Sequence, residues 1–193
     1  TLLSFNTVCE NSPILSHVDN GVLLLHTGSR ANLRINGDGL DGLGDEALQI
    51  SLVSREADGS MTVRVSGFGV SENRSGVRSI LGDGSEGNDT LDATGVPVPV
   101  TFYGDNGHDR LIAGDSGSTL FGGTGNNTLI GGFGIDIITA ADNDNTVRGG
   151  GGNDVINLGH GRNSVSGGPG NDAITAGNGP NELRGDEDSD DLR

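Results

Sequence analysis

The sequence predicts an all-β solenoid, in which two parallel sheets are built from stacked coils of 18 residues. The first observation is a repeat, because residues 104–193 divide without a gap into ten units of nine residues. The second is composition: 36 of the 193 residues are glycine and only 3% are aromatic, which is too little for a conventional core. Such a chain is disordered, fibrous or held by something besides a core, and the triplet spacing of collagen is absent.

Each nine-residue unit has the same internal layout. Its first six residues are mostly Gly, Asn or Asp, which tolerate the positive φ angles of tight turns. Its eighth residue is apolar, so the last three residues are predicted to form a short strand whose middle side chain points inward. Residues 84–92 also fit, 93–101 fit loosely, and Phe102 and Tyr103 form a two-residue insertion. The predicted inward residues are Leu91, Val100, Leu111, Leu120, Leu129, Ile138, Val147, Ile156, Val165, Ile174, Leu183 and Leu192.

Three units share one complete pattern, namely GGFGIDIIT, GGGGNDVIN and GGPGNDAIT at residues 131–139, 149–157 and 167–175. The pattern resembles the calcium-binding nonapeptide repeat of the RTX (repeats-in-toxin, hemolysin-type) family, GGxGxDxUx, where U is a large apolar residue. The resemblance covers roughly residues 80–193 and implies a right-handed parallel β-roll of about six coils. It also implies Ca²⁺ between the turns of successive coils, held by sixth-position carboxylates and turn carbonyl groups.

Because two units make one coil, the sixth residues of the units form two columns on opposite sides of the roll. The first column carries Ser118, Asp136, Asp154, Asp172 and Asp190. The second column carries Asp89, Asp109, Asn127, Asn145, Asn163 and Asn181. Ca²⁺ takes six to eight oxygen ligands, and stacked carboxylates repel each other unless a cation lies between them. We therefore expect about three to four ions. The expected pairs are Asp136 with Asp154, Asp154 with Asp172, Asp172 with Asp190, and Asp89 with Asp109.

The turns that carry aspartate are expected to supply further ligands through their glycine residues. These glycines are Gly131, Gly132, Gly134, Gly149, Gly150, Gly151, Gly152, Gly167, Gly168 and Gly170. The pair of Asp172 and Asp190 is less regular, because its last unit lacks two of the glycines. Asparagine is neutral, so the asparagines of the second column are expected to form a hydrogen-bonded ladder that needs no metal. Without metal the aspartate turns repel, so the ion is expected to contribute to folding.

Residues 1–79 do not repeat and are predicted to form a β-rich region that caps the roll of residues 80–193. Strands are expected at residues 14–18, 22–26, 32–35, 47–53, 61–65 and 77–81. The acidic segment at residues 36–46 is interpreted as a loop, because its spacing does not fit a helix–loop–helix calcium site.

The charge excludes several functions. A net charge of −16 disfavours binding to nucleic acid. No apolar run is long enough for membrane insertion by a helix.

Cys9 is the single cysteine and has no partner for an internal disulfide. The four histidines form no known catalytic motif, so the chain is predicted not to be an enzyme by itself. The sequence begins without Met and stops while the repeat pattern is still running, which favours a fragment of a longer protein.

The leading hypothesis is a calcium-binding structural module of a secreted or cell-surface bacterial protein, which folds on Ca²⁺ after export. The alternative is an accessory domain of a secreted protease, lipase or alginate epimerase whose catalytic domain lies outside this chain. Carbohydrate binding is weakly supported, because Arg110, Arg148 and Arg184 do not form one column, and ice binding is disfavoured by interrupted Thr and Asn rows. The sequence identifies calcium as a partner and no macromolecular one.

Overall fold

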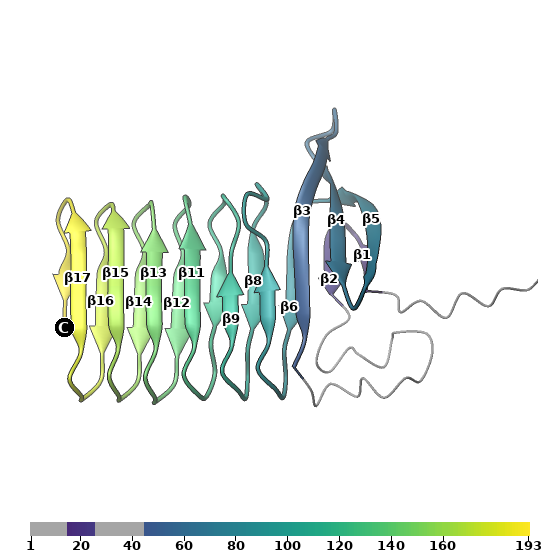
Figure 1. Ribbon diagram of the computed structural model, residues 1–193. Coiled ribbons are helices and arrows are strands. Elements are labelled where there is room, and N and C mark those ends of the chain that lie inside the picture. The colour runs from purple at the N-terminus through teal and green to yellow at the C-terminus, as the bar shows by residue number, and fades with distance from the viewer. Residues whose placement is uncertain (1–14, 26–44) are drawn as a thin grey trace, which may run out of the picture.

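The computed structural model describes residues 15–25 and 45–193, and in these ranges the regular elements are all strands (Figure 1). The strands form two sheets of nine strands each. The first sheet contains, in order, β1 (Ser16–Asp19), β2 (Val22–Leu25), β6 (Ser79–Asp83), β8 (Val100–Tyr103), β10 (Thr119–Phe121), β12 (Ile137–Ala140), β14 (Val155–Leu158), β16 (Ala173–Ala176) and β18 (Asp191–Leu192). The second contains β17 (Glu182–Glu187), β15 (Ser164–Pro169), β13 (Thr146–Gly150), β11 (Thr128–Gly132), β9 (Arg110–Ile112), β7 (Thr90–Asp92), β3 (Ala47–Arg55), β4 (Met61–Gly67) and β5 (Val70–Val77).

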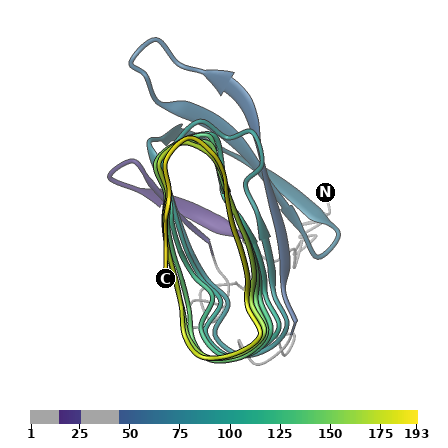
Figure 2. The ribbon, with the colours of Figure 1, turned by 90° about the vertical axis from the view of Figure 1, so that its left-hand side faces the viewer.

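The chain alternates between the two sheets and returns to the same sheet after each coil. Viewed along the stack, the coils superpose as flattened rings with the two sheets as their long sides (Figure 2). Parallel neighbours are 18 residues apart, as in the pairs of Leu129 with Val147 and of Ile138 with Ile156. The predicted parallel solenoid of about six coils is therefore confirmed.

The aliphatic ladder between the sheets forms the core, as the repeat predicts. The inward residues from Leu91 to Ile174 are each at most 3% exposed. Leu183 is only partly buried and Leu192 is 44% exposed, because they lie in the last coil and are covered from one side only. One coil thus depends on its neighbours for most of its apolar burial.

The two-residue insertion lengthens one strand without reversing its faces. Phe102 pairs with Leu120 in the next coil, while Val100 pairs with Ile80 in the preceding one, and both side chains are buried. Side chains alternate with a period of two along a strand, so an insertion of two residues keeps the inward face inward. As a result β7 and β9 stay in register across this longer coil, with Thr90 opposite Arg110.

Antiparallel strands cover the N-terminal end of the stack (Figure 1). The hairpin of β1 and β2 joins the first sheet through β2, which runs parallel to β6. The meander of β3, β4 and β5 joins the second sheet through β3, which runs parallel to β7. The expected strands at 47–53 and 61–65 match β3 and β4, and those at 14–18 and 22–26 overlap β1 and β2.

Two expectations for this region differ from the structure. Strand β5 was not expected, because its sequence VSENRSGV is mostly polar. The expected strand at 77–81 straddles the end of β5 and the start of β6. The expected strand at 32–35 and the loop at 36–44 lie outside the described residues, and the boundary at residue 80 stays a prediction.

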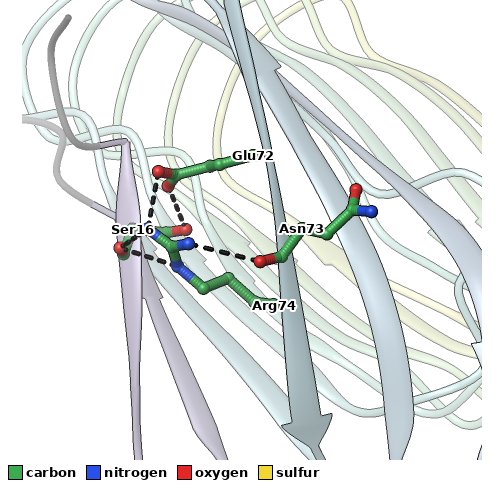
Figure 3. Close-up of polar contacts among 4 residues, drawn as sticks. All are labelled: Ser16, Glu72, Asn73 and Arg74. Atoms are coloured by element: carbon green, nitrogen blue, oxygen red, sulfur yellow. Dashed lines mark hydrogen bonds and ion pairs between the residues drawn. The ribbon is translucent and has the colours of Figure 1, made fainter. Parts of the chain in front are cut away.

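A partly buried polar cluster joins the two sheets at this end (Figure 3). The Ser16 hydroxyl of β1 donates to Glu72 Oε1 of β5 over 2.6 Å. Arg74 Nη2 donates to the Ser16 carbonyl oxygen over 2.8 Å and forms an ion pair with Glu72 Oε2 over 2.5 Å. Strands β1 and β5 belong to different sheets, so these charge-assisted hydrogen bonds fasten one sheet to the other.

Candidate metal sites

The first column lies in the turns that lead into the strands of the first sheet. The backbone N–H group of each of its first four residues donates to Oδ1 of the aspartate 18 residues further along, in the next coil. The distances are 2.6 Å from Ser118 to Asp136, 2.8 Å from Asp136 to Asp154, 2.8 Å from Asp154 to Asp172 and 2.9 Å from Asp172 to Asp190. The first three aspartates are at most 2% exposed, whereas Asp190 in the last coil is half-buried.

The second carboxylate oxygen of several aspartates has no hydrogen-bond donor. Within the described part of the chain, the buried side-chain oxygens without a partner are Oδ2 of Asp89, Asp109, Asp154 and Asp172. Asp136 differs, because its Oδ2 accepts a hydrogen bond of 2.8 Å from the backbone N–H of Gly132. A buried acceptor without a donor is costly unless another positive group, such as a cation, satisfies it.

Burial also makes these carboxylates hard to ionise. Desolvation raises the pKa of Asp154 to about 7 and that of Asp136 to about 6, although backbone hydrogen bonds oppose the shift. For Asp154 the neighbouring charges of Asp136 and Asp172 raise the pKa further. The pKa of Asp172 is also raised by burial. A cation bound at these turns would reverse the effect, because an adjacent positive charge favours the ionised form.

The first residue of each unit that carries aspartate is a glycine that faces the carboxylate. A Cβ atom on Gly149 would collide with Oδ2 of Asp154 and with the carbonyl oxygen of Gly167 in the next coil. The same two kinds of oxygen flank Gly131 and Gly167. A carboxylate oxygen and a carbonyl oxygen therefore lie close together in each of these turns, and at Asp154 and Asp172 no donor reaches the carboxylate oxygen. This arrangement fits the preference of Ca²⁺ for hard oxygen ligands.

Most of the other predicted turn glycines lie where adjacent coils approach each other closely. A Cβ atom on Gly132, Gly150 or Gly168 would meet the carbonyl oxygen of the second-position residue one coil earlier. On Gly134 it would meet the backbone of the preceding turn at Gly117, and on Gly152 and Gly170 the fourth-position carbonyl of the preceding coil. Gly151 is the exception, because a Cβ atom there would meet only Phe133 at ordinary contact distance.

The asparagines of the second column form the predicted ladder. The backbone N–H groups of Asn127, Asn145 and Asn163 donate to Oδ1 of the next asparagine over 3.0, 3.1 and 3.0 Å. Their side-chain Nδ2 groups donate to turn carbonyl oxygens, for example from Asn163 to Gly159 over 3.2 Å and from Asn181 to Gly177 over 2.7 Å. In these turns the side-chain NH₂ group therefore has an acceptor, whereas in several aspartate turns the corresponding carboxylate oxygen has no donor.

Asp89 and Asp109 lie in the second column but have the chemistry of the first. The Asp89 N–H donates to Asp109 Oδ1 over 2.9 Å, and the Asp109 N–H donates to Asn127 Oδ1 over 2.8 Å. Burial raises the pKa of Asp89 to about 7 and that of Asp109 to about 6. Above them, the backbone N–H of Glu46 donates to Asp89 Oδ1 over 2.7 Å. Glu46 was expected in an acidic loop, and no repeat pattern marked it as part of this column.

The donor set restricts the kind of metal that would fit. Across residues 15–25 and 45–193, no three histidine, cysteine, aspartate or glutamate side chains converge on a metal-sized site. A cation would therefore depend on one or two carboxylates and on backbone carbonyl oxygens. His108 and His160 serve the turns instead, since their Nδ1 atoms accept hydrogen bonds of 2.9 and 2.7 Å from Asn126 and Asn178.

Fold and turn chemistry together define a parallel β-roll whose aspartate turns present carboxylate and carbonyl oxygens, the ligands that Ca²⁺ prefers. The model of the RTX calcium-binding nonapeptide repeat, in four copies, matches residues 103–138, 139–174 and 166–193. This match confirms, over residues 103–193, the resemblance to the RTX calcium-binding nonapeptide repeat family that the sequence pattern indicates. No curated protein and no solved structure matches the chain. The described residues contain no helix capable of crossing a membrane.

Proposed function

We propose that this chain is a calcium-dependent structural module of a secreted or cell-surface bacterial protein, and that it folds on Ca²⁺ after export. The observation that carries the proposal is the set of buried carboxylate oxygens that have no donor, at Asp154 and Asp172 in the first column. In this proposal the first column holds about three ions, between Asp136 and Asp154, Asp154 and Asp172, and Asp172 and Asp190.

Folding depends on the ion because the metal-free roll has little stability in reserve. Each buried polar group without a partner costs about 1–3 kcal/mol, and a domain is stable by only about 5–15 kcal/mol. The core consists mainly of one aliphatic side chain per half-coil, and the chain carries a net charge of −16. Several unsatisfied carboxylates are therefore comparable to the whole stability of the roll.

Export follows from the same coupling. A ligand that binds only the folded state stabilises it by mass action, so scarce Ca²⁺ leaves the repeats unfolded and abundant Ca²⁺ folds them. An unfolded acidic chain suits passage through a secretion channel, and the RTX repeat family is typical of secreted bacterial proteins. The module itself carries out no reaction, and any catalytic domain of the parent protein would lie outside this chain.

The test is a Ca²⁺ titration followed by far-UV circular dichroism, with EDTA reversal and Mg²⁺ as the matched ion. We expect a cooperative transition from coil to β-structure with Ca²⁺, its reversal by EDTA and no transition with Mg²⁺, which demands near-ideal octahedral geometry and loses its water reluctantly. An unchanged β-spectrum in EDTA would contradict the proposal, because the hydrogen-bonded ladders would then suffice alone.

A further inference from the structure

We propose that an apolar groove on the second sheet is the contact surface between two copies of this chain, which pair across a two-fold axis. The groove lies where strands β9 and β11 lead into turns of the first column, and its volume is about 550 Å³. The proposal goes beyond the proposed function, because it assigns a macromolecular partner and requires only that the roll is folded.

The groove exists because two apolar residues interrupt a polar row on the outer face of the second sheet. Ile112 and Ile130 line it and pair with each other across β9 and β11, at the ninth position of their units. In the next two coils the same row continues with Arg148 and Ser166. Several turn glycines also line the groove and place no side chain in it. The surface between the two isoleucines and the turns is therefore open and apolar.

Phe133 projects beside this surface. It lines the groove and is 79% exposed, the highest fraction among the large apolar side chains that the structure describes. The fold does not require an aromatic residue there, since the same position is Asp115 in the preceding coil and Gly151 in the following one. Aromatic side chains that fill a pocket of the partner are the usual anchors of protein–protein contacts. Phe133 and the groove thus form a knob and a hole on one surface.

Two opposite charges border the groove. Arg110 lies on β9 and Asp115 in the turn that follows, and both line the groove. Across residues 15–25 and 45–193, neither side chain forms an ion pair or a hydrogen bond. A two-fold contact pairs residue i of one copy with residue j of the other, and j with i. It therefore places each Arg110 opposite Asp115 of the other copy.

The charge distribution favours a second copy over other occupants. Of the fourteen residues that line the groove only Arg110 and Asp115 are charged, so the groove is locally neutral although the chain carries −16. Exposed charges farther away than about 8–10 Å are largely screened at physiological ionic strength. A ligand with a single charge, such as a fatty acid or a basic peptide, would pair with one of the two residues and leave the other unpaired. A second copy pairs with both.

The experiment measures the molar mass of the folded full chain by sedimentation over a series of concentrations in Ca²⁺, with circular dichroism to verify folding. We expect the wild type to dimerise. R110D leaves only negative charges at the groove and D115R only positive ones, so each should weaken self-association by about tenfold or more. An equimolar mixture of these two variants should form a heterodimer. The double variant R110D/D115R should regain the homodimer, because its charges are exchanged.

Two further variants test the apolar part of the contact. F133G should weaken the dimer by about tenfold or more, and it should fold because Gly151 occupies the same position in the next coil. I137T is the matched control, because it removes another exposed apolar side chain of the same unit. Ile137 lies on β12 in the first sheet and does not line the groove, and its neighbour in the preceding coil is Thr119. I137T should keep the dimer.

The outcomes separate this proposal from the proposed function. A folded wild type that stays monomeric at every concentration would overturn the two-fold contact and leave the calcium-dependent module intact. A dimer that F133G does not weaken would also overturn it, as would charge variants that do not associate in their mixture. If the chain dimerises equally in EDTA with an unchanged β-spectrum, the contact stands and the proposed function fails. Should a charge variant not fold, F133G and I137T decide.

Discussion

The aspartate turns and the asparagine turns of the roll share one hydrogen-bonded scaffold and differ in one side-chain atom of the sixth residue. In both, the backbone N–H of each sixth residue donates to Oδ1 of the sixth residue in the next coil. The difference is the remaining side-chain atom, which is a donor in Asn163 and an unpartnered acceptor in Asp172. The same ladder therefore runs through both sets of turns, and this one atom determines whether the sixth residue keeps a buried oxygen without a donor.

The first residue of each unit differs in the same sense. In the asparagine turns it is Ala140, Leu158 or Ala176, which add apolar volume to the core, and only Gly122 breaks the rule. Each unit with aspartate at its sixth position begins with glycine instead. Most asparagine turns thus carry an apolar side chain at the first position. The aspartate turns have none there, and their first-position glycine faces a carboxylate oxygen.

The largest expected effect comes from replacing aspartates of the first column with asparagine, the residue of most turns in the second column. In D154N/D172N each new amide can donate where Oδ2 had no partner, so the metal-free roll should gain about 1–3 kcal/mol per replaced aspartate. At the same time folding should no longer require Ca²⁺. Urea unfolding in EDTA and in Ca²⁺ measures both effects.

The single variant D136N is the control, because Oδ2 of Asp136 already accepts from the Gly132 N–H. In D136N the new NH₂ group would face the Gly132 N–H, which is also a donor, and the hydrogen bond between them would be lost. The free energy of unfolding of the metal-free roll should therefore fall by about 0.5–1.5 kcal/mol. If D136N stabilised the metal-free roll as D154N/D172N does, the partner of Oδ2 would not be the deciding factor.

The reverse exchange should destabilise the roll. N145D/N163D replaces each side-chain NH₂ donor with an oxygen that has no donor. The free energy of unfolding in EDTA should therefore fall by about 1–3 kcal/mol per site. Ca²⁺ should not restore the loss, because Ala140 and Leu158 occupy the first positions of these turns. Thermal melts with and without Ca²⁺ would check this, and full rescue by Ca²⁺ would show that the glycine space is unnecessary.

Adding a methyl group at the first-position glycine of an aspartate turn should destabilise the roll less than these double exchanges. In G149A the new methyl group would collide with Asp154 Oδ2 and the Gly167 carbonyl oxygen, and overpacking of this kind costs about 1–3 kcal/mol. The matched change is G122A, whose methyl group would meet Asn127 Nδ2 at 3.0 Å and Leu129 Cδ1 at 3.1 Å, which is tight but tolerable. Calcium affinity should fall in G149A and stay unchanged in G122A, as measured by calorimetric titration.

The two columns should also differ in pH dependence. Burial raises the pKa of Asp154 from 3.8 to about 7, so the folded metal-free state binds protons more tightly than the unfolded state. Its stability should therefore be highest below pH 4, fall between about pH 4 and 7, and level off above. Calcium affinity should rise over the same interval, because the ion requires ionised carboxylates. Melts in EDTA at a series of pH values test this, and D154N/D172N should show a flatter profile.

The repeat made most of the roll predictable, because a period of nine residues sets the strands, the inward side chains and the two columns. Three features required the coordinates. The units of Asp136 and Asp154 look alike in sequence, yet only Asp136 receives the second-position N–H on Oδ2. Glu46 joins the second column from a segment that does not repeat. Strand β5 forms from a mostly polar sequence because it pairs with β4, which tertiary contacts determine and local pattern does not.

The most direct test of the difference between the columns is a calcium count on the folded protein, by native mass spectrometry, for the wild type and D154N/D172N. Every proposed site of the first column includes Asp154 or Asp172. The wild type should therefore hold about three to four ions, and the variant should hold only the one between Asp89 and Asp109. An equal count in the two proteins would show that the aspartates of the first column do not hold the ions.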